Sequence, residues 1–222
     1  SLTLAHILSN LASELNIKLV GFHIDLGIGD YSRKSKEIVK SLSKSLGIEL
    51  ITVELKEELG ESLPNVIKLL RKPACAICGT LKRYLINKYA VDLGVNRVAT
   101  GHVLDDVAKY ILASILTGNY SQLTKLIPAT PTTDKLISRI KPLYEVYERE
   151  TALYTFFNKL PAIDAQCPLT SKPEEAFTDY IGKLLKDLET RYPGIMLNLV
   201  RGVNKNIIKQ KFPESKIICG EH

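Results

Sequence analysis

The sequence predicts an α/β fold, a doubly wound and mostly parallel sheet followed by a C-terminal helical region. Apolar runs with strand character at 18–25, 49–55 and 96–100 alternate with stretches in which apolar residues recur every three or four positions. Strands that alternate with helices pair in parallel through right-handed crossovers. Polar motifs follow the first and third of these runs directly, where such sheets bind ligands.

The chain starts with a helical pattern over residues 2–15, in which Leu4, Leu8 and Leu11 share one face. The segment KLVGFHID at 18–25 predicts a short buried strand. A first helix with no strand before it lacks a neighbour in a doubly wound sheet. We therefore expect the natural protein to continue upstream of residue 1.

Two further units follow along the chain. The Ser- and Lys-rich residues 32–46 predict an amphipathic helix, and ELITVEL at 49–55 predicts a β-branched strand. Helical patterns cover residues near 61–71 and, after a cysteine pair, 79–93. This order continues the alternation of strand and helix.

The third strand is NRVAT at 96–100, and residues 103–117 return to a helical pattern. Residues 118–135 predict a loop, and ISRIKPL at 137–143 predicts a last strand. The remaining chain is mainly helical. The expected domains are 1–143, which is the α/β part, and 144–222, which is the helical region.

Composition bounds the class of protein. The chain has 222 residues, 45% of them hydrophobic, and a net charge of +6 with a pI near 9.0. The charge fits a polyanionic partner such as nucleic acid, and it also fits an ordinary basic surface. The sequence has neither an apolar run of membrane-spanning length nor a signal-peptide pattern, so we expect a cytoplasmic protein with reduced cysteines.

Four cysteines are the first candidate site. Cys75 and Cys78 form a C-x-x-C pair, Cys167 precedes a proline between expected helices, and Cys219 lies near the C-terminus. The pair alone fits a metal clasp, a redox pair or two buried thiols. Three thiolates from distant segments fit an iron–sulfur cluster with one open iron position, or zinc with a fourth ligand.

Acidic residues at strand ends are the second candidate site. TGHVLDD at 100–106 places Asp105 and Asp106 in the first turn of a helix, where they either cap the helix or hold Mg²⁺ against phosphates. Asp25 ends the first strand two residues after His23. The side chain of His23 fits best as a satisfied core residue.

Taken together, these motifs resemble the PP-loop ATP pyrophosphatase superfamily and, within it, the TtuA/TtcA family of tRNA 2-thiolation enzymes. The resemblance spans residues 1 to about 207. It is carried by SLTLA at the start, HIDLGIGDYS at 23–32, CAICGTLKRYLIN at 75–87, TGHVLDDVA at 100–108, RIKPL at 139–143 and DAQCP at 164–168. It implies the adenine nucleotide alpha hydrolase-like form of the doubly wound fold.

The resemblance implies that Cys75, Cys78 and Cys167 hold a [4Fe–4S] cluster whose open iron binds the incoming sulfur. ATP would adenylate the C2 oxygen of a tRNA pyrimidine, and sulfur would then replace it to give 2-thiouridine or 2-thiocytidine. Asp105 and Asp106 would be the catalytic residues that place Mg²⁺ and the phosphates.

Further roles come from the same resemblance. Ser1 matches the last serine of the family's phosphate loop, S-G-G-K-D-S, whose other residues would precede this chain. The implied contacts are, for ATP, Ser1, His23, Ile24, Asp25, Gly101 and Asp105, and, for tRNA phosphates, Lys82, Arg83, Arg139 and Lys141. Implied partners are tRNA, a sulfur donor such as a ubiquitin-like sulfur-carrier protein, and a second copy of the chain.

Two other functions compete with this one. The chain is alternatively a non-catalytic tRNA- or protein-binding module in which the cysteines hold structural zinc. It is alternatively another PP-loop ligase or amidotransferase, which keeps ATP adenylation and changes the product.

Overall fold

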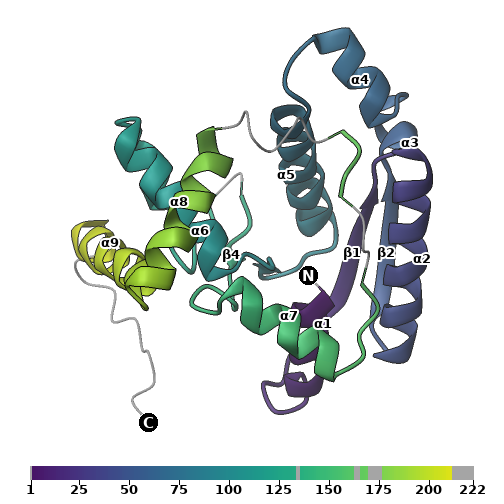
Figure 1. Cartoon of the computed structure of the whole chain (residues 1–222). Helices are drawn as coiled ribbons and strands as arrows, with labels where there is room; N and C mark the ends of the chain where they lie inside the picture. Colours follow the sequence, from purple (N-terminus) through teal and green to yellow (C-terminus); the bar gives the residue numbers. More distant parts are fainter. Residues whose placement is uncertain (1, 134–135, 163–165, 170–176, 212–222) are drawn as a thin grey trace.

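The structure is a computed structural model that describes residues 2–133, 136–162, 166–169 and 177–211. In chain order its elements are α1 (Leu2–Leu11), β1 (Val20–Asp25), α2 (Gly29–Ser45), β2 (Glu49–Glu54), α3 (Leu55–Leu59), α4 (Leu63–Leu70), α5 (Ala74–Asp92), β3 (Val98–Ala99), α6 (Leu104–Leu116), the 3₁₀ helix η1 (Tyr120–Lys125), β4 (Arg139–Ile140), α7 (Glu148–Phe157), α8 (Phe177–Arg191) and α9 (Ile195–Lys211). Figure 1 shows their arrangement.

Strands β1 and β2 pair in parallel, in a register that runs from Val20 opposite Glu49 to Asp25 opposite Glu54. Helices α2 and α5 lie on opposite faces of this pair (Figure 1). The Phe22 ring of β1 lies 5.2 Å from the Tyr89 ring of α5. Parallel strands covered on both faces are the doubly wound arrangement, so this part of the prediction is confirmed.

Strands β3 and β4 form a second parallel pair, with only two residues in each. Among the described residues, no strand joins this pair to β1 and β2. The predicted last strand, 137–143, is shorter because Pro142 has no N–H and the Lys141 amide donates to Pro128 O at 2.9 Å. The described strands thus form two parallel pairs, and the predicted parallel pairing is confirmed.

Helix boundaries differ from the expected ones at three places. Helix α1 ends at Leu11, four residues early, before a turn in which Asn16 has a left-handed φ of 49°. Helix α5 begins at Ala74 and not at residue 79, so it includes the cysteine pair. Residues 55–59 form a helix that was not expected, and the 118–135 segment contains η1.

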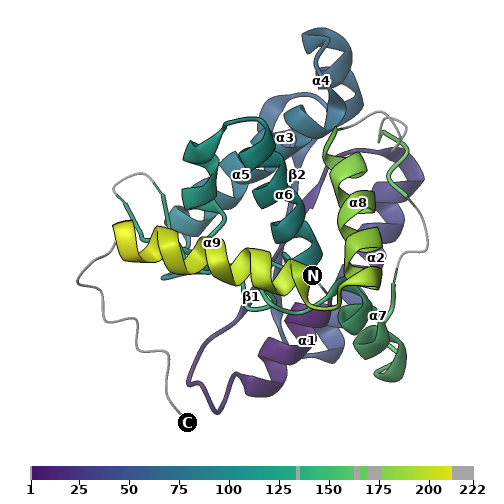
Figure 2. The ribbon, with the colours of Figure 1, turned by 60° about the vertical axis from the view of Figure 1, so that its left-hand side comes forward.

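The C-terminal helices pack on helices of the α/β part. Helices α8 and α9 cover α6, as Figures 1 and 2 show, and α7 packs on α1 through Thr3 Oγ1 and Thr155 Oγ1 at 2.9 Å. The main core is shared between α6, Tyr144, α8 and α9, and its most buried members are Leu104, Val107, Ala108, Ile111, Ile181 and Val200. The helical region is thus confirmed, while its division from the rest at residue 143 stays a prediction.

In the part of the chain that the structure describes, no helix has the length and apolar character needed to cross a membrane.

Candidate functional site

Cys75 and Cys78 lie in the first turns of α5, and their spacing of three places both thiols on one side of the helix. Pro73, directly before the helix, has no N–H, and its carbonyl accepts hydrogen bonds from the amides of Ala76 and Ile77. Cys75 is exposed and Cys78 is half-buried. Helical geometry therefore fixes the separation of the pair.

Cys167 reaches the same place from the segment between α7 and α8. It packs, with Cys78, against one apolar cluster formed by Leu26, Ile28, Leu55, Leu63, Ile77 and Leu85. All three cysteines are free thiols. Cys219 lies outside the described residues.

The electrostatics of Cys78 show that the three thiols are neighbours. Burial raises the pKa of Cys78, the nearby Lys82 ammonium lowers it, and the charges of Cys167 and Cys75 raise it again. Soft thiolate donors next to an apolar cluster suit zinc or an iron–sulfur cluster. Within the described residues, no three His, Cys, Asp or Glu side chains are placed so that they could hold a metal ion together. The three thiols are therefore neighbours that do not form a metal site in this structure.

The predicted tRNA-binding residues divide into two groups. Lys82 lies four residues after Cys78, on the cysteine side of α5, and its ammonium is within hydrogen-bonding reach of that thiol. Arg83 lies over Gly79, where an added Cβ would stand 3.2 Å from its Nη1. Arg139 Nη2 donates to Arg83 O at 3.2 Å. These three cations lie together beside the thiols.

Lys141 points inward. Its side chain is buried, and Nζ donates to Ile127 O at 2.5 Å and to Lys125 O at 3.2 Å. Burial and the nearby Arg139 lower the pKa of Lys141 to about 8. No described carboxylate forms an ion pair with Lys141, so its ammonium is held by backbone carbonyls below the surface.

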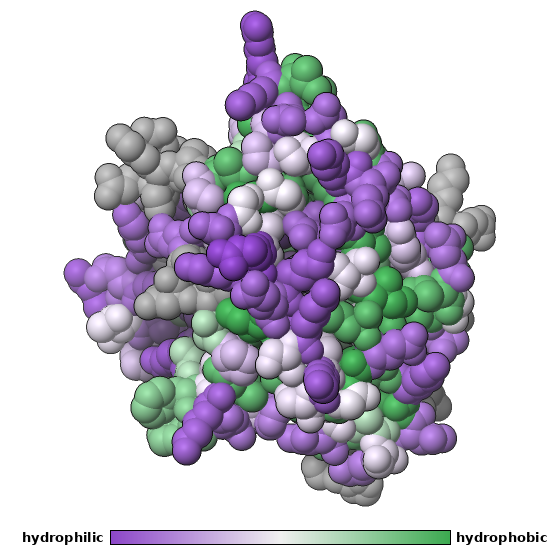
Figure 3. Space-filling model, turned by 90° about the vertical axis from the view of Figure 1, so that its right-hand side faces the viewer, coloured by the Kyte–Doolittle hydropathy of each residue, from purple (hydrophilic) through white to green (hydrophobic). Residues whose placement is uncertain are grey.

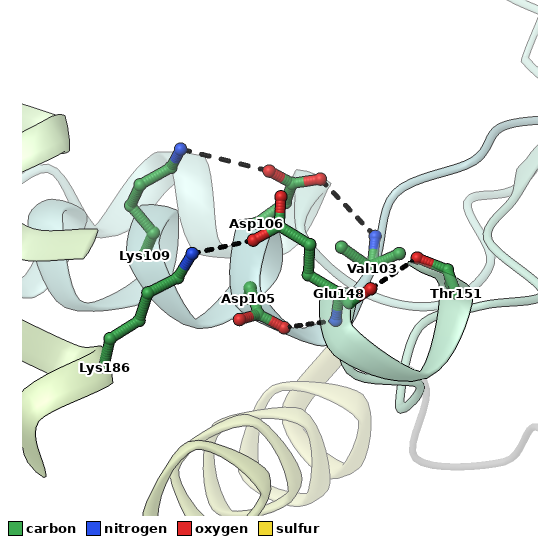
Figure 4. A network of polar contacts seen from close by, with 7 residues as sticks. All are labelled: Val103, Asp105, Asp106, Lys109, Glu148, Thr151 and Lys186. Carbon is green, nitrogen blue, oxygen red and sulfur yellow. Dashed lines mark hydrogen bonds and ion pairs between the residues drawn. The ribbon is translucent and has the colours of Figure 1, made fainter. Parts of the chain in front are cut away.

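Asp105 connects the end of β3 to the helical region (Figure 4). Its Oδ2 accepts a hydrogen bond of 2.7 Å from the backbone N–H of Glu148, the first residue of α7. The Glu148 carboxylate in turn pairs with Lys186 of α8 at 2.8 Å. A carboxylate at this position accepts a hydrogen bond from an amide that has no partner within the helix, and its negative charge interacts favourably with the positive end of the α7 dipole.

Asp106 caps its own helix. Its Oδ2 accepts from the Val103 N–H at 3.5 Å, and its Oδ1 lies 3.9 Å from Lys109 Nζ (Figure 4). Beside it, His102 Nδ1 hydrogen bonds with Thr100 Oγ1 at 2.9 Å. Asp106 therefore caps its own helix as that alternative predicts, whereas Asp105 caps α7. The Oδ1 lone pairs of Asp105 leave room for a cation.

The end of β1 contributes three predicted residues. Asp25 accepts from the Gly27 N–H at 3.0 Å and lies 3.5 Å from Lys36 Nζ. Ile24 packs against the apolar cluster that also holds Cys78. His23 Nε2 is buried with no hydrogen-bond partner among the described residues, and burial lowers the pKa of His23. The expectation of a satisfied core histidine is thus wrong for this nitrogen.

Gly27 is required where β1 turns toward α2. Its φ is +69°, and an added Cβ would stand 2.9 Å from Ser62 Cβ. Ser1 lies outside the described residues, and Gly101 is half-buried at the β3 end.

Several residues of this site carry no sequence signal. Lys36 bridges Asp25 and Glu54, the latter at 2.5 Å, and Glu148 and Lys186 complete the contacts of Asp105. Each looks like an ordinary charged residue on a helix or strand end. Only the three-dimensional neighbours show their part in the site.

The fold and the three thiols define a doubly wound α/β protein with neighbouring cysteines at one apolar cluster. No protein-family model matches the sequence. A tRNA-5-methyluridine(54) 2-sulfurtransferase from Pyrococcus horikoshii is 40% identical over 204 residues, which are 92% of this chain and 63% of that protein. The sulfurtransferase of the same name from Thermotoga maritima is 34% identical over 214 residues, 96% of this chain and 68% of that protein.

A solved structure gives the same result. The U34-tRNA thiolase NcsA from Methanococcus maripaludis, with its [4Fe-4S] cluster, superimposes with a TM-score of 0.83 at 25% identity, over 97% of this chain and 70% of that one. The chain belongs to the tRNA 2-thiolation family, and the resemblance seen in the motifs is confirmed. This chain spans 63% of the length of the Pyrococcus relative, which is less than two thirds.

Proposed function

We propose that this chain is the catalytic part of an ATP-dependent tRNA 2-sulfurtransferase that makes 2-thiouridine. The observation that carries the proposal is that Cys78 and Cys167 pack on one apolar cluster, with Cys75 and Lys82 beside Cys78. The named relatives support it, since two are named for 5-methyluridine 54 and one for uridine 34 of tRNA. Uridine is therefore the proposed substrate, in preference to cytidine.

In this proposal the three thiols hold a [4Fe–4S] cluster, a cofactor that the named NcsA structure contains. Such a cluster, held by three cysteines, supplies an open iron position for an incoming sulfide. Lys82 faces Cys78 and stabilises its thiolate form, which metal binding requires. The exposure of Cys75 leaves one side of the centre open to solvent and substrate.

ATP is proposed to bind beyond the carboxyl ends of β1 and β3. The backbone at residues 23–25 and at Gly101 would line the nucleotide, with Ser1 at the phosphates. The lone pairs of Asp105 and Asp106 that make no contact with an amide would take Mg²⁺. Asp105 would then serve two purposes, because its Oδ2 also holds the first amide of α7.

Binding of tRNA is assigned to the three cations Lys82, Arg83 and Arg139, which form no ion pair with a described carboxylate. Lys141 is assigned to support this surface from below, through the carbonyls that it binds. A sulfur-carrier protein as donor, a homodimer and a cytoplasmic location belong to the same proposal.

The centre is tested by its metal content. Anaerobic purification of the full-length protein should give a brown protein with iron and sulfide in cluster proportions. Cys167→Ser should lose the cluster, whereas Cys219→Ser, a matched control, should keep it. Equal loss in both variants would contradict the ligand assignment, and stoichiometric zinc without iron would favour the structural module.

The reaction is tested by its product. The holoprotein is incubated with ATP, sulfide and tRNA that is either unmodified or carries 5-methyluridine at position 54. Nucleoside mass spectrometry should then detect 2-thiouridine or 5-methyl-2-thiouridine, at a position that sequencing of the digest identifies. Formation of 2-thiocytidine would contradict the choice of uridine. A reaction that consumes ATP and gives a product without added sulfur would favour the ligase or amidotransferase alternative.

A further inference from the structure

The end of α4 projects from the body of the protein, at the top of Figure 1. The helix is anchored by Leu63, Val66 and Ile67, which pack on the apolar cluster below the cysteines. Its last turn has no such anchor, and all residues from 68 to 73 are exposed. We call residues 68–73, which read KLLRKP, the α4 tip.

The α4 tip combines apolar and positively charged side chains. Leu69 is 72% exposed and Leu70 53% exposed. Lys68, Arg71 and Lys72 form no ion pair with any described residue, whereas Lys36 and Lys88 elsewhere pair with carboxylates. Figure 3 shows hydrophilic and hydrophobic side chains next to each other at the top of the molecule, where α4 ends. Such a surface suits a partner that offers both negative charge and apolar faces.

The α4 tip also lies next to the thiols. Arg71 has a left-handed φ of 50°, which ends α4 and turns the chain toward α5. The exposed Cys75 lies four positions after Arg71, so their Cα atoms are at most ~14 Å apart. A partner that reaches Cys75 therefore meets the α4 tip.

The proposed reaction defines what such a partner must offer. Chemistry at the C2 atom of a base requires that the base leave its stack, and RNA is read where bases are splayed out. Apolar side chains fill or wedge the vacated stack in nucleic acid complexes, and cations bind the phosphates on either side. RNA thus satisfies both the apolar and the charged components of the α4 tip.

We propose that the α4 tip is an RNA-contact element of the thiolation site. Its two leucines pack against a base beside the one that is turned toward Cys75, and its three cations hold the flanking phosphates. The inference rests on the proposed function, and it adds a contact that the three cations on α5 and β4 do not supply.

The test separates the two components by their salt dependence. Binding of unmodified tRNA to the full-length protein is measured over a range of salt concentrations. Leu69→Ser with Leu70→Ser should weaken binding by about tenfold or more with the same log–log slope, because a lost apolar contact releases no counterion. Arg71→Gln with Lys72→Gln should lower the slope by about two.

The chain offers a matched control in Phe156 and Phe157, which are 76% and 74% exposed. They belong to α7, a helix that lies away from α4 in Figure 1. Phe156→Ser with Phe157→Ser should leave tRNA affinity unchanged. Iron content and the urea midpoint should also stay unchanged in the tip variants, because the substituted side chains are exposed.

Two results would overturn the inference alone. In the first, the native protein binds and thiolates tRNA while both tip variants keep its affinity and slope. In the second, the leucine variant binds tRNA normally and loses only binding of a purified sulfur-carrier protein, which would make the α4 tip a protein-docking surface. If the native protein neither bound nor thiolated tRNA, the proposed function itself would fail.

Discussion

Glu189 joins three segments of the helical region, and its replacement by glutamine should destabilise the protein strongly. The side chain is buried. Its Oε1 accepts from Gly194 N at 2.6 Å and from Tyr147 Oη at 2.9 Å, and its Oε2 accepts from Met196 N at 2.9 Å. The carboxylate therefore holds the turn between α8 and α9 to the residue that precedes α7.

The magnitude follows from counting acceptors. A glutamine side chain has one oxygen, so in either orientation its NH₂ group faces the N–H of Gly194 or of Met196. One buried amide then lacks an acceptor, at about 1–3 kcal/mol, and the remaining bonds lose the strength that a charged acceptor gives. We expect Glu189→Gln to lower the free energy of unfolding by about 2–4 kcal/mol. Tyr147→Phe, which removes one bond, should cost about 1 kcal/mol.

Urea unfolding at pH 7 measures both changes, with Asp187→Asn as the control. Asp187 forms an exposed i,i+4 pair with Arg191 on the same helix, so its replacement should cost about 0.5 kcal/mol or less. A Glu189→Gln protein as stable as the native one would refute the reasoning. A cost that the Asp187 variant shared would show that α8 tolerates no change of charge.

The pH dependence of stability gives a second measurement. Burial alone would raise the pKa of Glu189, but the amides of Met196 and Gly194 and the Tyr147 hydroxyl outweigh burial and lower it. The unfolded chain therefore binds this proton more readily. The contribution of Glu189 is fully present above its ordinary pKa, near 4.5, and is lost as the pH falls through the lowered folded value. The glutamine variant should lack this component.

Three further predictions concern the proposed sites. Asp105→Asn should reduce ATP-dependent release of pyrophosphate far more than tRNA binding. Asparagine can still accept a hydrogen bond from the Glu148 amide, but the negative charge that would bind Mg²⁺ is lost. Equal loss of both activities would indicate a folding defect. Lys82→Gln with Arg83→Gln should flatten the salt dependence of tRNA binding by about two units, and an unchanged slope with altered iron content would show that these cations serve the thiols. The free energy of unfolding of the native protein should rise between about pH 8 and 10.5, because the unfolded chain holds the Lys141 proton more tightly than the folded one. Lys141→Met should remove this rise. The same rise in both proteins would contradict the burial of a charged ammonium.

The local patterns of the sequence predict the first half of the fold well. The β-branched run at 49–55 and the apolar run at 18–25 locate β2 and β1 to within two residues. Strands and amphipathic helices can be predicted in this way because their buried faces impose a regular spacing of apolar residues along the sequence. The start of α5 was missed because a segment with two cysteines and Gly79 carries no clear apolar period. The short β3 and β4 depend on Pro142 and on the Pro128 carbonyl, which is distant in sequence.

The candidate site depends on contacts that no local pattern encodes. The C-x-x-C spacing predicts that Cys75 and Cys78 are neighbours, whereas the choice of Cys167 as the third thiol depends on the family resemblance. The Asp105 contact spans 43 residues to Glu148, so capping of another helix was not foreseen. Lys141 resembles a surface lysine in the sequence, because its hydrogen bonds to two backbone carbonyls depend on contacts that no local pattern shows.

Placement of Cys75 and Cys78 within one helix also determines which insertions the centre tolerates. Each added residue between them would rotate one thiol by about 100° around the α5 axis and turn it away from its partner. Cys167 lies in a connection between α7 and α8, where a change of length need not rotate the thiol in this way. In related sequences, the spacing within the pair should therefore be invariant, whereas the distance from the pair to the third cysteine should vary.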